Sequence, residues 1–134
     1  MKGRNPNQIS IYQKNERINI AFHDIICVEA AGCYSIFHTR NNNIYVSCHP
    51  LKYYEQLFAK ASFFRINRSF LINQNYITYF HIDTRELILS NKLQLTVSFR
   101  KCKSFVTAVY GNCQKLKYKR YIQKLNTSNL TANI

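Results

Sequence analysis

The sequence predicts a mainly β domain with one or two short helices. Apolar and polar residues alternate with a period of two in several short segments, a pattern typical of strands that bury one face. Turn signals rich in Asn, Asp, Ser and Gly separate these segments at short intervals. The 134 residues suit one domain, and a 46% hydrophobic composition is enough for a core despite a formal net charge of +13. Together these observations favour many short strands over a helical bundle.

The first part of the chain is expected to form strands. We expect four of them, at residues 18–22, 24–29, 34–39 and 44–47. The first alternates Ile18, Ile20 and Phe22 with small or polar residues, and the second is a buried apolar run interrupted at residues 30–32. Residues 41–43 are three asparagines, which tolerate the left-handed conformation of a tight turn, so the third and fourth strands should form a hairpin.

A short amphipathic helix is expected next, over residues 50–60. Pro50 suits a first helical turn, where its missing N–H is not needed. The apolar residues at helical spacing are Leu51, Tyr54, Leu57 and Phe58. Further strands are then expected at residues 63–66, 69–72, 77–82, 86–89 and 93–97. Turns rich in Asn and Asp join most of these strands, and the polar pair Asn67-Arg68 separates the first two.

A second helix is expected through Tyr110, with Ser98 as its N-cap and Gly111-Asn112 as its stop signal. Its predicted apolar stripe is Phe99, Cys102, Phe105, Val106 and Val109. Beyond this helix, apolar residues between Tyr118 and Leu125 repeat at i, i+3, i+4 and i+7 among lysines and an arginine. This pattern indicates either a further helix or a basic tail that orders on contact with a partner.

The positive charge is distributed unevenly. Residues 1–86 carry ten cations and all six acids, whereas residues 87–134 carry nine cations and no acid. Such a surface favours a polyanionic partner, because neutralising phosphates releases counterions and supplies most non-specific affinity for nucleic acid. The C-terminal third is therefore the expected polyanion-facing part. A solvated basic face that only keeps the protein soluble is the alternative.

Other sequence features bear on the cellular compartment, on metal binding and on enzyme activity. No apolar run approaches the roughly 18 residues of a membrane-spanning helix and no secretory signal is evident, so a cytoplasmic protein without a membrane partner is expected. The five Cys include no Cys-x-x-Cys pair and are expected to be reduced thiols that bind no metal. Because the chain has no glycine-rich phosphate loop and no nucleophile or zinc motif, we expect no enzyme activity and no cofactor.

Three segments carry motifs of one known family. Residues 63–77 read FFRINRSFLINQNYI, residues 95–101 read LTVSFRK, and residues 18–29 read INIAFHDIICVE. These segments resemble three conserved parts of the LytTR DNA-binding domain, which is found in LytR/AgrA/AlgR-type transcriptional regulators. The resemblance covers residues 17–111. It departs at Asn67, where the family often has His, and at Thr96 and Phe99, where Pro and Arg are common.

The resemblance implies an elongated β-β-β sandwich of about ten short strands in small antiparallel sheets, with one or two short helices. It divides the chain into an N-terminal extension (1–16), a LytTR-like DNA-binding domain (17–111) and a basic C-terminal tail (112–134). It also implies a bacterial transcriptional regulator that binds specific double-stranded DNA through loops in the major groove, with two copies on promoter direct repeats. The chain would then be a stand-alone regulator or the output domain of a longer response regulator, whose receiver or sensor domain lies outside this sequence.

The same resemblance, together with side-chain charge, assigns the DNA-facing positions. They are Tyr34, Ser35, Asn67, Arg68, Ser69, Ser98, Arg100, Lys101 and Lys103. Arg68 and Arg100 suit guanine edges or phosphates, because the guanidinium group can donate two parallel hydrogen bonds, and Asn67 suits an adenine edge. The serines suit phosphate contacts, and the lysines, Lys92 included, are less directional charges. Arg65 is expected to make a supporting ion pair or a loop hydrogen bond.

A second class of function stays open from the residues. The same charge, with exposed Tyr and Phe as stacking platforms, would suit an RNA-binding or ribosome-associated β protein. A membrane-surface role for the amphipathic segment 113–125 is a weaker possibility. Affinity for single-stranded RNA against duplex DNA separates the two nucleic-acid functions.

Overall fold

The computed structural model describes residues 7–111, and in this range the chain forms ten strands and two α-helices. The strands are β1 (Gln8–Gln13), β2 (Glu16–Ala21), β3 (Ile25–Ala31), β4 (Tyr34–Thr39), β5 (Ile44–Ser47), β6 (Phe63–Arg65), β7 (Phe70–Asn73), β8 (Ile77–His81), β9 (Glu86–Leu89) and β10 (Gln94–Thr96). The helices are α1 (Leu51–Leu57) and α2 (Phe99–Tyr110), with 3-10 turns η1 (Phe22–Asp24) and η2 (Gln74–Tyr76). The basic segment after Asn112 and its helical periodicity lie outside the described residues.

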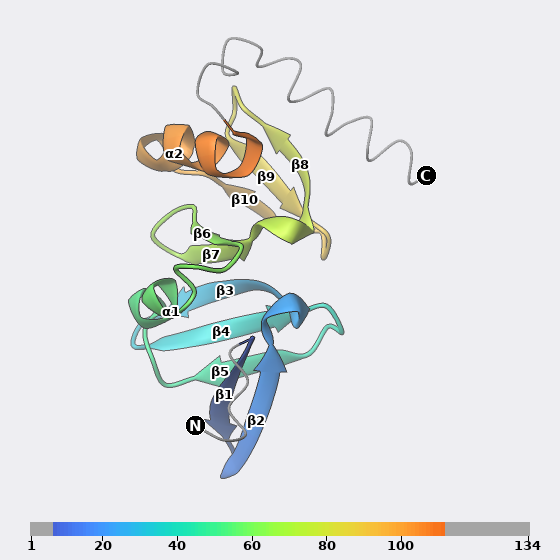
Figure 1. The fold of residues 1–134 in the computed structure, drawn as a ribbon, viewed down its shortest axis with the longest axis vertical. Helices are drawn as coiled ribbons and strands as arrows, with labels where there is room; N and C mark the ends of the chain where they lie inside the picture. The colour runs from blue at the N-terminus through green and yellow to red at the C-terminus, as the bar shows by residue number, and fades with distance from the viewer. Residues whose placement is uncertain (1–6, 112–134) are drawn as a thin grey trace.

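Three small antiparallel sheets follow one another along the long axis of the molecule (Figure 1). β1 and β2 form a two-stranded ribbon. The central sheet has the strand order β5-β4-β3-β7-β6, and the third sheet has the order β10-β9-β8. The predicted fold class, mainly β with about ten short strands and one or two short helices, is therefore confirmed.

Two hydrophobic cores share the central sheet. Neighbouring residues of a strand point to opposite faces. Val28 and Leu71, paired across β3 and β7, belong to the core under β1, β2 and α1, whereas the adjacent pair Cys27 and Ile72 belongs to the core under the third sheet and α2. Burial on both faces explains why the start of β3 is a continuous apolar run instead of an alternating one.

Strand β1 lies within the residues that the sequence analysis assigned to an N-terminal extension. Ile9 pairs with Ile20 of β2, and Ile9 and Ile11 are buried in the first core. The period-two alternation of residues 8–13 is the signal for this strand, and it was missed. Lys14 and Asn15 have positive φ values of 54° and 64°. A two-residue hairpin turn of type I′ requires positive φ at both of its central residues.

Helix α1 is shorter than predicted, and its apolar stripe differs. Pro50 is the residue before the helix, in an extended conformation, and the last helical residue is Leu57. Leu51, Tyr54 and Phe58 are buried at spacings of three and four, whereas Leu57 is exposed. The rings of Phe58 and Phe63 stack with centroids 4.4 Å apart, so the chain leaves the helix where Phe58 packs into the core.

Helix α2 begins after Ser98 and runs to Tyr110, as predicted, with Phe105 and Val106 fully buried. Phe99 was expected on the same apolar stripe, but it is 84% exposed. Side chains in a helix tilt toward its N-terminus, so the first residue projects beyond the helix end instead of onto the sheet. The Arg85 guanidinium carbon lies 5.7 Å from the Phe99 ring centroid.

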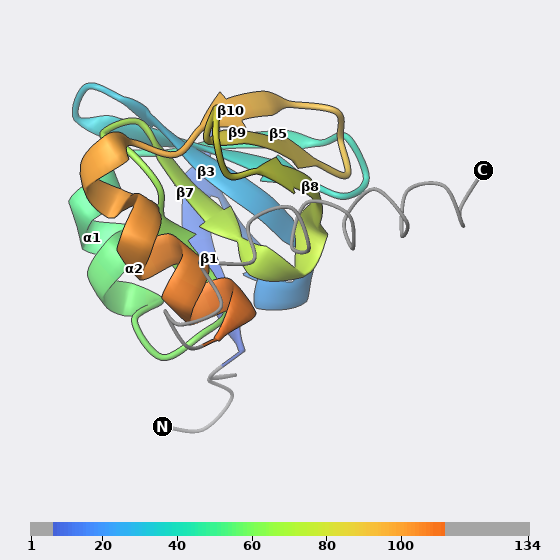
Figure 2. The same cartoon turned by 90° about the horizontal axis from the view of Figure 1, so that it is seen from above.

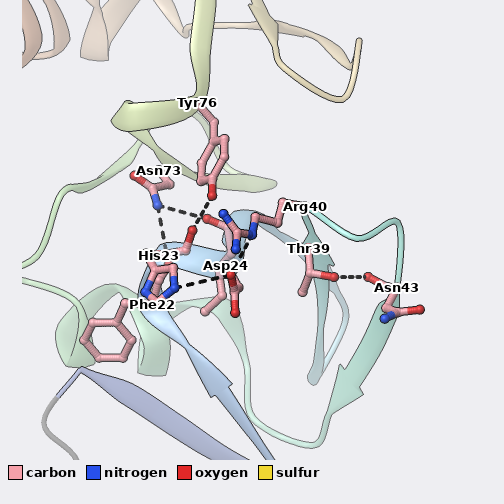
Figure 3. A network of polar contacts seen from close by, with 9 residues as sticks. Phe22, His23, Asp24, Thr39, Arg40, Asn43, Asn73 and Tyr76 are labelled. Atoms are coloured by element: carbon pink, nitrogen blue, oxygen red, sulfur yellow. Dashed lines mark hydrogen bonds and ion pairs between the residues drawn. The ribbon is translucent and has the colours of Figure 1, made fainter.

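A polar network joins η1 and the start of β3 to the end of β7 and the turn η2 (Figure 3). The buried amide of Asn73 donates to the carbonyl of Ile25 at 3.0 Å, and its oxygen accepts from the backbone N–H of Asn75 at 3.0 Å. The hydroxyl of Tyr76 donates to the carbonyl of His23. These bonds hold the 3-10 turn η2, from which the third sheet starts.

Replacing Asn73 with alanine is expected to lower the free energy of unfolding by ~1–3 kcal/mol, because the buried carbonyl of Ile25 and the partly buried N–H of Asn75 both lose their partner. Urea denaturation followed by circular dichroism measures the change. Asn43→Ala is the control, since the Asn43 side chain is exposed, and its effect should stay within about 0.5 kcal/mol. Equal losses for the two variants would contradict this role of Asn73.

Candidate nucleic-acid interface

The turn between β6 and β7 contains three of the predicted DNA-facing residues, Asn67, Arg68 and Ser69. The side-chain oxygen of Asn67 accepts from the backbone N–H groups of Ser69 at 2.7 Å and Phe70 at 2.9 Å. Its side-chain nitrogen donates to the carbonyl of Thr96 at 2.7 Å. Pairing with an adenine edge needs a free acceptor and donor on the same amide. In this conformation both acceptor sites of Asn67 are used, so Asn67 shapes the turn, whereas Arg68 and Ser69 are exposed.

Arg65 supports the same turn from β6. Its Nη1 lies 2.9 Å from Oε1 of Glu55 in α1, its Nε donates to the carbonyl of Asn67 at 3.1 Å, and its Nη2 donates to the carbonyl of Arg68 at 2.6 Å. The expectation that Arg65 makes an ion pair and loop hydrogen bonds is confirmed.

The start of α2 lies directly beside this turn. The backbone N–H of Ser98 donates to the carbonyl of Ile66 at 2.9 Å, and the hydroxyl of Ser98 accepts from the N–H of Lys101 at 3.3 Å. Ser98 is therefore the N-cap of α2, as its sequence context predicted. Arg100 is exposed in the first turn of the helix, Lys101 is half-buried, and Lys103 is exposed further along.

The turn between β3 and β4 lies on the other side of the β6–β7 turn. The backbone N–H of Ala30 donates to the carbonyl of Ser69 at 2.8 Å. Gly32 has a φ of 64°, which a glycine adopts without strain, and Tyr34 directly after the turn is 53% exposed. Ser35 differs from its expected role, because it is fully buried and its hydroxyl donates to the carbonyl of His49 at 2.7 Å. In this conformation its hydroxyl is not accessible to a phosphate.

These three loops lie along one edge of the molecule. In Figure 1 the β3–β4 turn, the β6–β7 turn and the start of α2 all lie on the left, and the view from above in Figure 2 shows the same arrangement. The backbone bonds from Ala30 to Ser69 and from Ser98 to Ile66 join them. The structure thus places the exposed residues Tyr34, Arg68 and Arg100 on neighbouring segments, although they are far apart in the sequence.

Lys92 does not belong to this edge. It lies in the turn between β9 and β10, at the end of β10 opposite Ser98, with a φ of 69°. Phe99 and Arg85, which were not predicted as site residues, do belong to it, because Phe99 immediately follows Ser98 and Arg85 donates to the carbonyl of Val97 at 3.2 Å. Phe99 is one of the positions at which the chain departs from the motif that it resembles, and this departure is the sequence signal for an altered contact surface.

No group of metal ligands is found in the part of the chain that the structure describes, where no three His, Cys, Asp or Glu side chains come together. Burial, and secondly the nearby charge of Glu29, raise the pKa of the Cys27 thiol to about 12. Cys27 is therefore an uncharged core residue. Neither helix between residues 7 and 111 is long and apolar enough to cross a membrane.

Comparison with known proteins assigns the family. The family model of the LytTr DNA-binding domain matches residues 15–109. The fold is similar to that of a Bacillus cereus chain described as the LytTr DNA-binding domain of a methyl-accepting/DNA response regulator, with a TM-score of 0.65 and 23% identity over 79% of this chain and 98% of that one. A comparison with curated protein sequences gave no significant match. Because the family model covers most of the chain, this protein belongs to the LytTR DNA-binding domain family.

Proposed function

We propose that this protein regulates bacterial transcription by binding specific double-stranded DNA, with the three joined loops inserted into the major groove. The observation that supports it best is the single edge on which Tyr34, Arg68 and Arg100 are exposed together. Two of these three side chains are arginines, which can read guanine edges or hold phosphates. Family membership makes DNA the expected partner.

Within this proposal the side chains divide into two groups. Arg68 and Arg100 are the candidates for base readout, because Arg68 is exposed in the β6–β7 turn and Arg100 is exposed in the adjoining first turn of α2. Ser69, Lys101 and Lys103 are the candidates for phosphate contacts, with the basic segment 112–134 adding sequence-independent affinity. The DNA-binding domain is then residues 17–111 with β1 packed on it as an added strand, and it works as a stand-alone regulator or as the output domain of a longer one, with two copies on a direct repeat.

The RNA-binding alternative depends on exposed aromatic rings. Tyr54 is buried and Tyr45 is half-buried, which leaves little ring surface for stacking on unpaired bases at these two positions. The Tyr53 ring is already stacked on His49, with centroids 4.1 Å apart. Tyr34 and Phe99 are both exposed on the edge that carries Arg68 and Arg100, so aromatic rings are present there, and the family model is what favours DNA over RNA.

Selection from a random duplex pool, followed by fluorescence anisotropy, tests the proposal. The selected duplex should bind more tightly than a scrambled duplex of the same length. Its log affinity should fall with log salt by about 0.9 for each phosphate contacted. Tighter binding to single-stranded RNA than to every duplex would contradict DNA as the partner. A duplex carrying two copies of the selected site should bind two protein chains.

A further inference from the structure

Glu55 and Arg65 join α1 to the proposed DNA-contacting turn. We infer that Arg65, held by Glu55, is a positioning residue that fixes the backbone from which Arg68 reaches DNA. This inference rests on the proposed function for its consequence, but its structural basis is independent of that function. Neither side chain is proposed to touch DNA.

The geometry uses each nitrogen of the guanidinium group for a different purpose. Nη1 meets the carboxylate of Glu55 at 2.9 Å, while Nε and Nη2 donate to the carbonyls of Asn67 and Arg68 at 3.1 and 2.6 Å. Such a planar fork can bridge a helix and two successive carbonyls at once. A lysine in the same place has one compact ammonium group and cannot reproduce the three directions.

The two bonds to the turn complement those made by Asn67. The Asn67 side chain satisfies the N–H groups of Ser69 and Phe70, and Arg65 satisfies carbonyls on the other side of the same turn. A turn held on both sides is ordered before DNA arrives, so less conformational entropy is lost on binding. The Arg65 side chain is only 19% exposed, and its ion pair with Glu55 holds the guanidinium group at the turn.

Replacing Glu55 distinguishes two effects on DNA binding, the orientation of Arg65 and the simple repulsion between a carboxylate and phosphates. A carboxylate near a DNA-binding surface repels phosphates, so charge alone predicts that Glu55→Gln strengthens binding to every duplex. Positioning predicts the opposite for a specific duplex, because Arg65 loses the partner that orients it. The sign of the change therefore distinguishes the two explanations.

The experiment measures affinities of the full chain for the selected and the scrambled duplex across a salt series. We expect Glu55→Gln to weaken binding to the selected duplex by about tenfold. Affinity for the scrambled duplex should stay equal or rise, with an unchanged salt slope. Glu29→Gln is the matched control, since its carboxylate is 37% exposed against 38% for Glu55, and it bonds to His38 at 2.9 Å instead of to the turn. The control should not weaken either affinity.

Arg65→Lys, which keeps the charge, should behave like Glu55→Gln. Amide hydrogen exchange without DNA gives a second readout, and exchange at Ser69 and Phe70 should become faster in both variants at an unchanged melting temperature. Unchanged exchange, stronger binding of Glu55→Gln to the selected duplex, or equal weakening on both duplexes would overturn the inference. Failure of the wild-type chain to prefer any duplex would instead contradict the proposed function, and the exchange data would still decide the role of Arg65.

Discussion

Replacing Phe105 with alanine is expected to lower the free energy of unfolding by about 3–5 kcal/mol. Phe105 is fully buried in α2, and its ring packs edge-on against Phe64 and Phe80, with centroids 5.6 and 4.9 Å apart. Removing the ring loses this contact area and leaves a cavity that neighbouring strands cannot fill. Small domains have a total stability of about 5–15 kcal/mol, so the variant should approach the limit of folding.

Denaturation by urea measures this loss, and the same helix supplies the control. Phe99→Ala removes the same side chain from the first position of α2, where it is 84% exposed, so its effect should stay near the ~0.5–1 kcal/mol of an exposed cation–π contact with Arg85. Comparable losses for Phe99→Ala and Phe105→Ala would contradict the packing of α2 described above. DNA affinity of Phe105→Ala should fall together with stability, because α2 carries Arg100.

Local signals were sufficient for most elements. Ser98 was predicted as an N-cap because serine before an amphipathic run accepts from a backbone N–H two or three residues later, and the structure confirms it. Turns rich in Asn were predicted between the strands, and Asn73 holds one of them by accepting from the backbone N–H of Asn75. Strand β1 was missed although Ile9 and Ile11 alternate with polar residues and its partner strand was expected at residues 18–22, since six residues next to a basic, polar terminus are a short signal.

The roles of side chains in the loops could not be predicted in the same way. Asn67 was interpreted as a base reader, but its partner Thr96 is 29 residues away in the sequence. Ser35 was interpreted as a phosphate ligand, but β4 pairs with β5 so that Ser35 lies opposite Ser47, and the buried hydroxyl of Ser35 donates to the carbonyl of His49. A polar side chain satisfies whichever partner the fold brings to it, and local sequence does not contain that information.

Replacing Arg100 is expected to have the second large effect, on DNA affinity, because Arg100 is exposed and lies beside the β6–β7 turn. If it reads a base edge, Arg100→Ala should weaken binding to the selected duplex by ~1–3 kcal/mol and relax the preference at one base pair. Repeating the duplex selection with the variant measures both changes. Lys103→Ala is the control, since Lys103 is an exposed cation of the same helix, and it should weaken all duplexes alike.

Arg100→Lys decides between reading a base and holding a phosphate. Lysine keeps the charge but lacks the planar pair of donors that matches O6 and N7 of guanine. Base readout therefore predicts that Arg100→Lys retains the affinity for scrambled duplex and loses the preference at the same base pair as Arg100→Ala. A phosphate contact predicts that Arg100→Lys resembles the wild-type protein on every duplex, while Arg100→Ala weakens all of them uniformly and lowers the salt slope by about one phosphate. That second outcome would leave Arg68 as the base-reading arginine of this edge.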